Sequence, residues 1–188
     1  MTLPVYVGLV HYPIYNKNEK IITTAITNFD IHDIARTART YDVKKYFIIN
    51  PLESQQALVH EMIDYWQAGY GEKYNPDRKE AFSIVNVISD IDDAVKTIEE
   101  IEKKKPIIVT TDARRFENSI SYSVLREKIS AADNPCLLLF GTGWGIEKDV
   151  MKSFDYILDP ILGPCEYNHL PVRAAVAIIL DRLLGVNV

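Results

Sequence analysis

The chain has 188 residues, of which 47% are hydrophobic and 25% are charged, with a formal net charge of −5. This composition is typical of one globular domain over residues 1–188 that is long enough to bury a substantial core. No secretion signal and no apolar run of membrane-spanning length stands in the sequence, so we expect a cytoplasmic protein with no membrane partner. The net negative charge argues against a wholly basic nucleic-acid binder, although local clusters of Lys and Arg suffice to hold a phosphate backbone.

The cysteines and histidines form no metal-binding pattern. Cys136 and Cys165 lie far apart with no C-x-x-C, and His11, His32 and His60 lack the spacing of metal ligands. We therefore expect no metal and no disulfide, and we predict that both cysteines pack in the core.

Strand-like and helix-like segments alternate along the chain. The predicted strands are residues 5–10, 46–49, 83–87, 106–110, 136–140 and 156–158. Predicted helices begin at Asp30 as an N-cap, at Pro51, at Ser89–Asp90, at Ser121 and at Pro171. This alternation predicts an α/β fold with a mostly parallel sheet and helices on both faces. Residues 69–80 lack periodicity and are predicted to be an ordered loop or a partner-binding segment.

The last predicted helix, residues 171–184, is apolar around most of its circumference. Such a helix must be buried on more than one side. One sheet face accounts for part of this burial, so we expect a second copy of the chain to cover the rest.

Three closely spaced glycines follow the strand at 136–140, in the segment FGTGWG at residues 140–145. Their spacing matches neither the dinucleotide fingerprint nor the P-loop. Taken alone, the segment fits either a bare backbone that approaches a small ligand or an ordinary tight turn. Since a second strand, 156–158, is followed by Pro160 and Gly163 before the last helix, we expect two adjacent strand-end loops to close around one ligand.

Three segments together resemble the motifs of the SPOUT class of RNA methyltransferases. Residues 30–38 (DIHDIARTA) resemble motif 1, residues 140–145 motif 2, and residues 160–177 motif 3. The resemblance is strongest to a small bacterial SPOUT family, sometimes fused to a tRNA guanine-N1 methyltransferase, with HYP, YNP, FGTGWG and YNHL segments. These stand here at residues 11–13, 74–76, 140–145 and 167–170. The resemblance covers nearly the whole chain and implies a deep C-terminal trefoil knot, bound S-adenosylmethionine (SAM) and a homodimer.

The resemblance also implies which residues bind SAM. An adenine needs apolar walls together with backbone donors and acceptors, and strand-end loops supply both. The expected cofactor-binding residues are Thr110, Thr111, Phe140, Gly141, Thr142, Gly143, Ile157, Leu158, Pro160, Ile161 and Leu170.

Arg36 corresponds to the motif 1 arginine that similar ribose 2′-O-methyltransferases place at the ribose hydroxyl. Because a guanidinium has a pKa above about 12, we expect Arg36 to bind phosphate or to stabilise the developing alkoxide, with deprotonation of the hydroxyl as the second option. From the residues alone, Arg36 and Arg39 also fit the exposed face of an amphipathic helix. Asp30 stands where the related ribose methylases have asparagine, and Asn168-His169-Leu170 stands where they have Ser-Leu-Asn.

Asn168 and His169 are the other expected catalytic residues, because they precede a helix N-terminus, which favours anions. His169 fits a structural histidine equally well. The expected substrate-binding residues offer stacking surfaces and phosphate contacts, although Tyr-Asn-Pro also fits a turn that fixes a loop. They are Tyr12, Arg39, Tyr74, Asn75 and Arg78.

These features predict a SAM-dependent RNA methyltransferase that acts on a ribose 2′-oxygen of tRNA. The alternatives are a base (guanine N1-type) methyltransferase and a dimeric RNA-binding module that retains a cofactor pocket. A nucleotide-dependent α/β enzyme is disfavoured, because no P-loop lysine and no ribose-binding acid follow the glycines.

Overall fold

The computed structural model describes residues 3–131 and 133–186. Its centre is a seven-stranded sheet in the order β5–β4–β1–β8–β6–β9–β7, in which every neighbouring pair is parallel. The strands are β1 (Val5–Val10), β4 (Lys45–Ile49), β5 (Val85–Ile88), β6 (Ile107–Thr111), β7 (Ser119–Ile120), β8 (Cys136–Gly141) and β9 (Tyr156–Leu158). The predicted parallel α/β fold is confirmed, and only the two-residue β7 was missed in this sheet.

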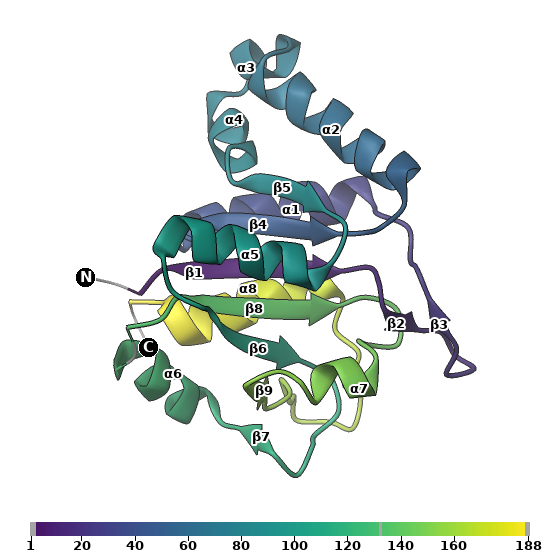
Figure 1. Ribbon diagram of the computed structural model, residues 1–188, viewed down its shortest axis with the longest axis vertical. Helices are drawn as coiled ribbons and strands as arrows, with labels where there is room; N and C mark the ends of the chain where they lie inside the picture. The colour runs from purple at the N-terminus through teal and green to yellow at the C-terminus, as the bar shows by residue number, and fades with distance from the viewer. Residues whose placement is uncertain (1–2, 132, 187–188) are drawn as a thin grey trace.

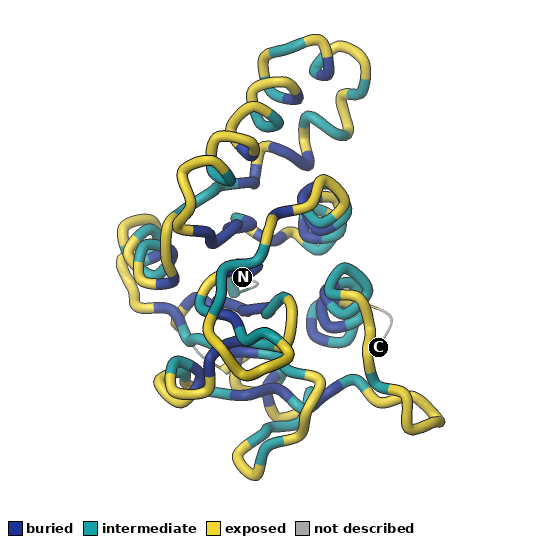
Figure 2. The backbone as a smooth tube through the Cα atoms, turned by 90° about the vertical axis from the view of Figure 1, so that its right-hand side faces the viewer, coloured by how far each residue is buried: buried dark blue, intermediate teal, exposed yellow. Residues whose placement is uncertain are grey.

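Helices cover both faces of the sheet (Figure 1). Their apolar residues form two cores, because successive strand side chains point to opposite faces: Val7 and Leu9 pack in one core, Tyr6 and Val10 in the other. Figure 2 shows the buried backbone along the middle of the molecule and exposed turns along the outer helices. The first core includes residues of α1 (Asn28–Thr40), α2 (Glu53–Gln67), α4 (Pro76–Phe82), α6 (Tyr122–Ala131) and α8 (Val172–Leu184), and the second includes residues of α5 (Ile91–Glu102) and α7 (Lys148–Met151).

Strands β6, β8 and β9 end at the same edge of the sheet. Strand β8 lies between β1 and β6, and β6 lies between β8 and β9. Since all of them are parallel, the loops after β6, β8 and β9 emerge side by side. Ligands of open α/β sheets bind at this edge, outside the carboxyl ends of the strands.

Helix α1 begins one turn earlier than predicted. Thr27 is its N-cap: the Thr27 side chain accepts a hydrogen bond from the amide of Asp30 and donates one to Oδ2 of Asp30 at 2.7 Å. The prediction of Asp30 as the N-cap was wrong. In a capping box a hydroxyl stands at the N-cap and an acidic side chain stands three residues later in the first turn, and Asp30 is this second residue.

The prediction that residues 69–80 form a loop was also wrong. They contain α3 (Tyr70–Tyr74) and most of α4. The Asn75 side chain caps α4 by accepting a hydrogen bond from the amide of Arg78 at 3.0 Å, and Pro76 occupies the first turn. Helices of five and seven residues are too short to show an apolar period.

A small antiparallel hairpin, β2 (Ile14–Tyr15) and β3 (Ile21–Ile22), lies outside the main sheet, and a β-bridge between Ile14 and Ile146 joins it to the segment that follows β8. Of the two cysteines, Cys136 is buried as predicted, whereas Cys165 is exposed and its predicted core position was wrong. None of the helices in the described ranges is long and apolar enough to span a bilayer.

Candidate functional site

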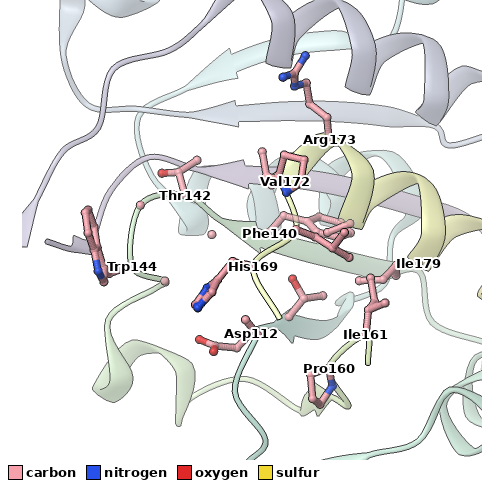
Figure 3. A pocket seen from close by; sticks show the side chains of 18 of the residues that line it. Asp112, Phe140, Thr142, Trp144, Pro160, Ile161, His169, Val172, Arg173 and Ile179 are labelled. Atoms are coloured by element: carbon pink, nitrogen blue, oxygen red, sulfur yellow. The ribbon is translucent and has the colours of Figure 1, made fainter. Parts of the chain in front are cut away.

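A cavity of about 810 Å³ lies at the carboxyl ends of β6, β8 and β9 (Figure 3). Its volume falls within the range of about 300–1,000 Å³ that is typical of small-molecule sites. Residues from five segments line it, within the ranges 24–30, 111–114, 140–145, 159–161 and 168–179. The two strand-end loops that were predicted to close around one ligand therefore lie on one cavity.

The glycine loop, residues 141–145, is held by close packing of its glycines. Gly143 and Gly145 have φ of +54° and +94°, which disfavours any side chain. A Cβ on Gly143 would lie 3.0 Å from the side chain of Ile14, and one on Gly145 would lie 2.9 Å from Oδ2 of Asp112. The glycines thus let the loop pack between the β2–β3 hairpin and the loop that follows β6.

Backbone hydrogen bonds tie the same loop to the hairpin. The amide of Trp144 donates to the carbonyl of Tyr15 at 3.1 Å, and the amide of Tyr15 donates to the carbonyl of Gly145 at 3.0 Å. The amide of Gly145 also closes the turn on the carbonyl of Thr142 at 3.0 Å. The loop is therefore fixed along most of its length before any ligand binds.

A chain of hydrogen bonds runs from the buried His11 to Thr142 in the glycine loop. Nδ1 of His11 lies 2.9 Å from Oγ1 of Thr24, which lies 2.6 Å from Oγ1 of Thr142. Because the Thr142 hydroxyl donates to the carbonyl of Val10 at 3.0 Å, the Thr24 hydroxyl must donate to Thr142, and Nδ1–H of His11 must donate to Thr24. Burial lowers the pKa of His11 to about 4, so the ring is neutral with its proton on Nδ1.

Asp112 and Arg114, just after β6, form a bidentate ion pair on the cavity wall. Nε and Nη2 of Arg114 lie 2.9 and 2.7 Å from the two carboxylate oxygens of Asp112, whose side chain is 4% exposed. The hydrogen bond to Asp112 raises the pKa of Arg114 further. Arg114 therefore presents a fixed cation to the cavity.

Arg173 connects the segments that resemble motifs 1 and 3. It lies in the first turn of α8, with Nη1 at 2.8 Å from Oδ2 of Asp33 and Nε at 3.4 Å from Oδ1 of Asp30. Asp30 and Arg173 both line the cavity. No side chain in the described part of the chain caps the N-terminus of α8 at Pro171, so its free amides lie at the cavity wall, where they favour an anion.

Most of the predicted cofactor-binding residues line the cavity. The exceptions are Thr110, Ile157 and Leu158, which are buried in β6 and β9 beneath it. The residues that line it are Thr111, Phe140, Gly141, Thr142, Gly143, Pro160, Ile161 and Leu170.

The predicted catalytic residues divide between two places. Asn168 and His169 line the cavity, and Nδ2 of Asn168 donates to the carbonyl of Ala113 at 2.6 Å, which joins the loop before α8 to the loop after β6. Arg36 is exposed on α1 and does not line the cavity of its own chain. It borders a separate hollow of about 210 Å³ together with Arg39.

The structure does not bring the predicted substrate-binding residues to the cavity either. Arg39 pairs with Glu80 at 2.7 Å, and Arg78 lies 4.8 Å above the ring of Trp66. Tyr74 is 71% exposed on α3, next to the cap residue Asn75. Figure 1 shows α3 and α4 at the end of the molecule opposite to β9. Tyr12, exposed before β2, lines no part of the cavity.

The cavity residues without a predicted role as ligand-binding side chains include Thr24, Asp112, Arg114, Trp144 and Arg173. The sequence carried a signal for Asp112 and Arg114, because polar residues directly after a buried parallel strand lie at the edge of the sheet where ligands bind. Trp144 lies within the segment FGTGWG, whose backbone was the expected ligand contact, whereas Thr24 and Arg173 reach the cavity through contacts between distant segments. Within the described residues, no group of three His, Cys, Asp or Glu side chains is arranged to hold a metal.

A family model described as SAM-dependent RNA methyltransferase matches residues 4–185. A protein of Aquifex aeolicus (strain VF5) is 45% identical over 183 residues, which cover 97% of this chain and 89% of that protein. A tRNA (guanine-N(1)-)-methyltransferase of Oleidesulfovibrio alaskensis (strain ATCC BAA-1058 / DSM 17464 / G20) is 42% identical over 183 residues. That match covers 96% of this chain but 42% of the relative, so the chain spans less than half of that protein.

Among solved structures, the TrmH/SpoU tRNA modifying enzyme of A. aeolicus aligns with a TM-score of 0.55 at 16% identity. The alignment covers 97% of this chain and 73% of that one. At this identity the likeness shows a common fold, and it agrees with the parallel sheet described above.

Proposed function

Because the chain belongs to the family of SAM-dependent RNA methyltransferases and has the SPOUT fold, we propose that its cavity binds SAM and that it methylates a ribose 2′-oxygen of tRNA. One observation carries this proposal: the segments that resemble motifs 1, 2 and 3 meet on a single cavity, through Asp30, residues 140–145 and residues 160–173. The proposed unit is a single domain over residues 1–188 with a knotted C-terminus.

The cavity suits SAM in both its apolar and its polar walls. Phe140, Ile161 and Leu170 offer apolar surface for an adenine, and the strand-end loops offer backbone groups for its edge. Arg114 and the uncapped start of α8 favour the carboxylate of the methionine moiety. SAM supplies a methyl group on a sulfonium, and the chain's task is to hold the attacking oxygen close to that methyl and in line with it.

The choice of target atom rests on Arg36. Its correspondence to the motif 1 arginine of ribose methylases favours the 2′-hydroxyl, where a guanidinium stabilises a developing alkoxide. The relative named as a guanine-N1 methyltransferase is more than twice as long as its matched part, so its name does not assign that activity to this region. Base methylation is the second candidate.

A homodimer would bring Arg36 to a cavity. Within one chain Arg36 lies outside the pocket, while Phe29 on α1 and Leu170 before α8 are 69% and 44% exposed. Ala174, Ala177 and Ile178 leave one side of α8 only partly covered. We propose that a second copy packs on α1 and α8, so that each Arg36 serves the partner's cavity. A tRNA substrate implies that this dimer works in the cytoplasm.

Mass spectrometry of nucleosides tests the reaction. The protein is incubated with unmodified total tRNA and methyl-labelled SAM, and the tRNA is then digested. We expect a labelled 2′-O-methyl nucleoside. A labelled base would favour the second candidate, and SAM binding without any incorporation would favour an RNA-binding module that retains the cofactor pocket.

A further inference from the structure

Trp144 is a large aromatic side chain that the fold leaves in solvent at the edge of the cavity. It is 60% exposed, although it stands between two glycines in the middle of the glycine loop. The other tryptophan, Trp66, is 9% exposed in the core. Figure 3 shows the Trp144 indole at one side of the cavity and His169 nearer to its centre.

The backbone that carries Trp144 is fixed. Its amide donates to the carbonyl of Tyr15, and the flanking Gly143 and Gly145 have positive φ and pack against Ile14 and Asp112. A rigid loop that presents an indole to solvent loses little conformational freedom when a flat ligand stacks on it. The exposure of Trp144 is therefore built into the loop.

Two basic side chains lie near this position, each with an acidic partner: Arg114 pairs with Asp112, and Nζ of Lys148 lies 3.8 Å from Oε1 of Glu19. Arg114 reaches to 3.2 Å of the place where a Cβ on Gly145 would stand, and it lines the cavity with Trp144. Lys148, four residues along the chain, lies over the ring of Tyr15, the residue whose carbonyl holds Trp144. Indole and cations together are the pattern that binds single-stranded nucleic acid, in which bases stack and phosphates pair.

We propose that Trp144 is a stacking platform for an unpaired RNA base at the mouth of the cavity. The inference rests on the proposed function, because the target ribose must approach the cavity past this edge, and it assigns the base contact to a residue of the glycine loop. RNA is favoured over a second copy of the chain, because the exposed apolar residues expected in the dimer lie on α1 and α8, whereas Trp144 stands at the cavity edge with the charged side chains of Arg114 and Lys148 nearby. Sequence-specific RNA recognition uses such splayed bases stacked on aromatic rings.

Tryptophan fluorescence tests the contact without any need for turnover. In W66F, Trp144 is the sole tryptophan, and excitation is chosen to select tryptophan over the tyrosines. Should W66F not fold, the difference between the emission of the wild type and that of W144F gives the same signal. The probes are a mixed-sequence single-stranded oligoribonucleotide of about 10 nucleotides and an abasic strand of the same length, both labelled so that anisotropy reports saturation. We expect the base-containing strand to quench Trp144 and the abasic strand to leave its emission unchanged.

Substitutions give the matched affinity test. W144L should weaken binding of the base-containing strand by about 5- to 150-fold, while W144F should retain it within about threefold, since a phenyl ring still stacks. Three results would overturn the inference: equal quenching by both strands, no quenching at saturation, or emission that changes with protein concentration alone. The last of these would assign Trp144 to a protein interface. Failure of SAM binding together with base-dependent quenching would reject the proposed function and leave this contact standing.

Discussion

At the scale of single residues, the hydrogen-bond chain His11–Thr24–Thr142 joins the buried end of β1 to the cavity. Thr24 and Thr142 both line the cavity, whereas His11 is 1% exposed. The neighbours of each hydroxyl fix which hydrogen bond it donates and which it accepts. These hydrogen bonds therefore orient Thr142 at the start of the glycine loop. These residues are positioning residues for the proposed SAM site.

Replacing Thr24 tests this positioning role. Thr24→Val keeps the shape of the side chain and removes the hydroxyl between His11 and Thr142, so each of these two residues loses its hydrogen bond to Thr24. We expect the Kd for SAM, measured by calorimetry, to rise about five- to tenfold, which corresponds to about 1–1.4 kcal/mol. Thr24→Ser restores the hydroxyl and should bind SAM as the wild type does; equal affinities of the Val and Ser variants would refute the role.

His11 also makes stability depend on pH. Its pKa is about 4 in the folded chain against an ordinary value of 6.5, so the unfolded chain binds more protons between these values and stability rises with pH there. This contribution amounts to about 3 kcal/mol, present above pH 6.5 and lost as the pH falls towards 4. Denaturant unfolding of the wild type and of His11→Asn at pH 4, 5.5 and 7 should show a steeper pH dependence for the wild type. Parallel curves for the two proteins would contradict the argument.

At the scale of elements, the glycine loop and the strand ends around it decide the shape of the site. The loop packs so closely that Gly145 has no room for a side chain, and its φ of +94° strains any other residue. Gly163, in the loop before α8, has no heavy atom within 4 Å of the place where its Cβ would stand. Substitution of Gly145 and Gly163 by alanine therefore gives a variant and its matched control.

Gly145→Ala should weaken SAM binding about tenfold or more, because the strained loop shifts away from Asp112 and Arg114. Gly163→Ala should change the Kd for SAM by less than about twofold, since the new Cβ would have no heavy atom within 4 Å. Calorimetric titration of both variants, each checked for a cooperative thermal transition, measures the difference. An unchanged Kd in Gly145→Ala would show that the loop does not shape the cofactor site.

The elements also show where prediction from sequence succeeds and fails. Buried parallel strands read as continuous apolar runs, so β1, β4 and β8 were predicted from the sequence. The loops at 140–145 and 160–170, which were predicted to close around one ligand, line one cavity. Helices α3 and α4 escaped prediction because each has fewer than three turns. The resemblance named Arg36 but carried no information on which cavity it serves, and Arg173 became visible only when α8 was placed against α1.

At the scale of the whole molecule, the proposed role of Arg36 requires two chains. Within one chain the cavity holds Asn168 and His169, and Arg36 lies outside it. If each Arg36 serves the partner's cavity, a variant that lacks this arginine and a variant that binds SAM weakly can complement one another when SAM is limiting. Arg36→Ala retains an intact cavity, and Gly145→Ala retains the arginine.

Mixed dimers of Arg36→Ala and Gly145→Ala should therefore recover methyl transfer. With random exchange of subunits, half of the dimers are mixed and each has one complete site, so activity should reach roughly a quarter of the wild-type value. Methyl incorporation into total tRNA, measured before and after exchange, gives the comparison. No recovery in a mixture shown by native mass spectrometry to contain mixed dimers would place Arg36 in the site of its own chain or outside the mechanism.

The central claim, that this cavity holds SAM, is tested most directly by ultraviolet cross-linking of methyl-labelled SAM to the wild-type protein, followed by peptide mapping. We expect label in peptides that contain residues 111–114, 140–145 or 159–173, and we expect unlabelled SAM to compete with it. Label confined to other peptides, such as those of α3 and α4, would contradict the claim.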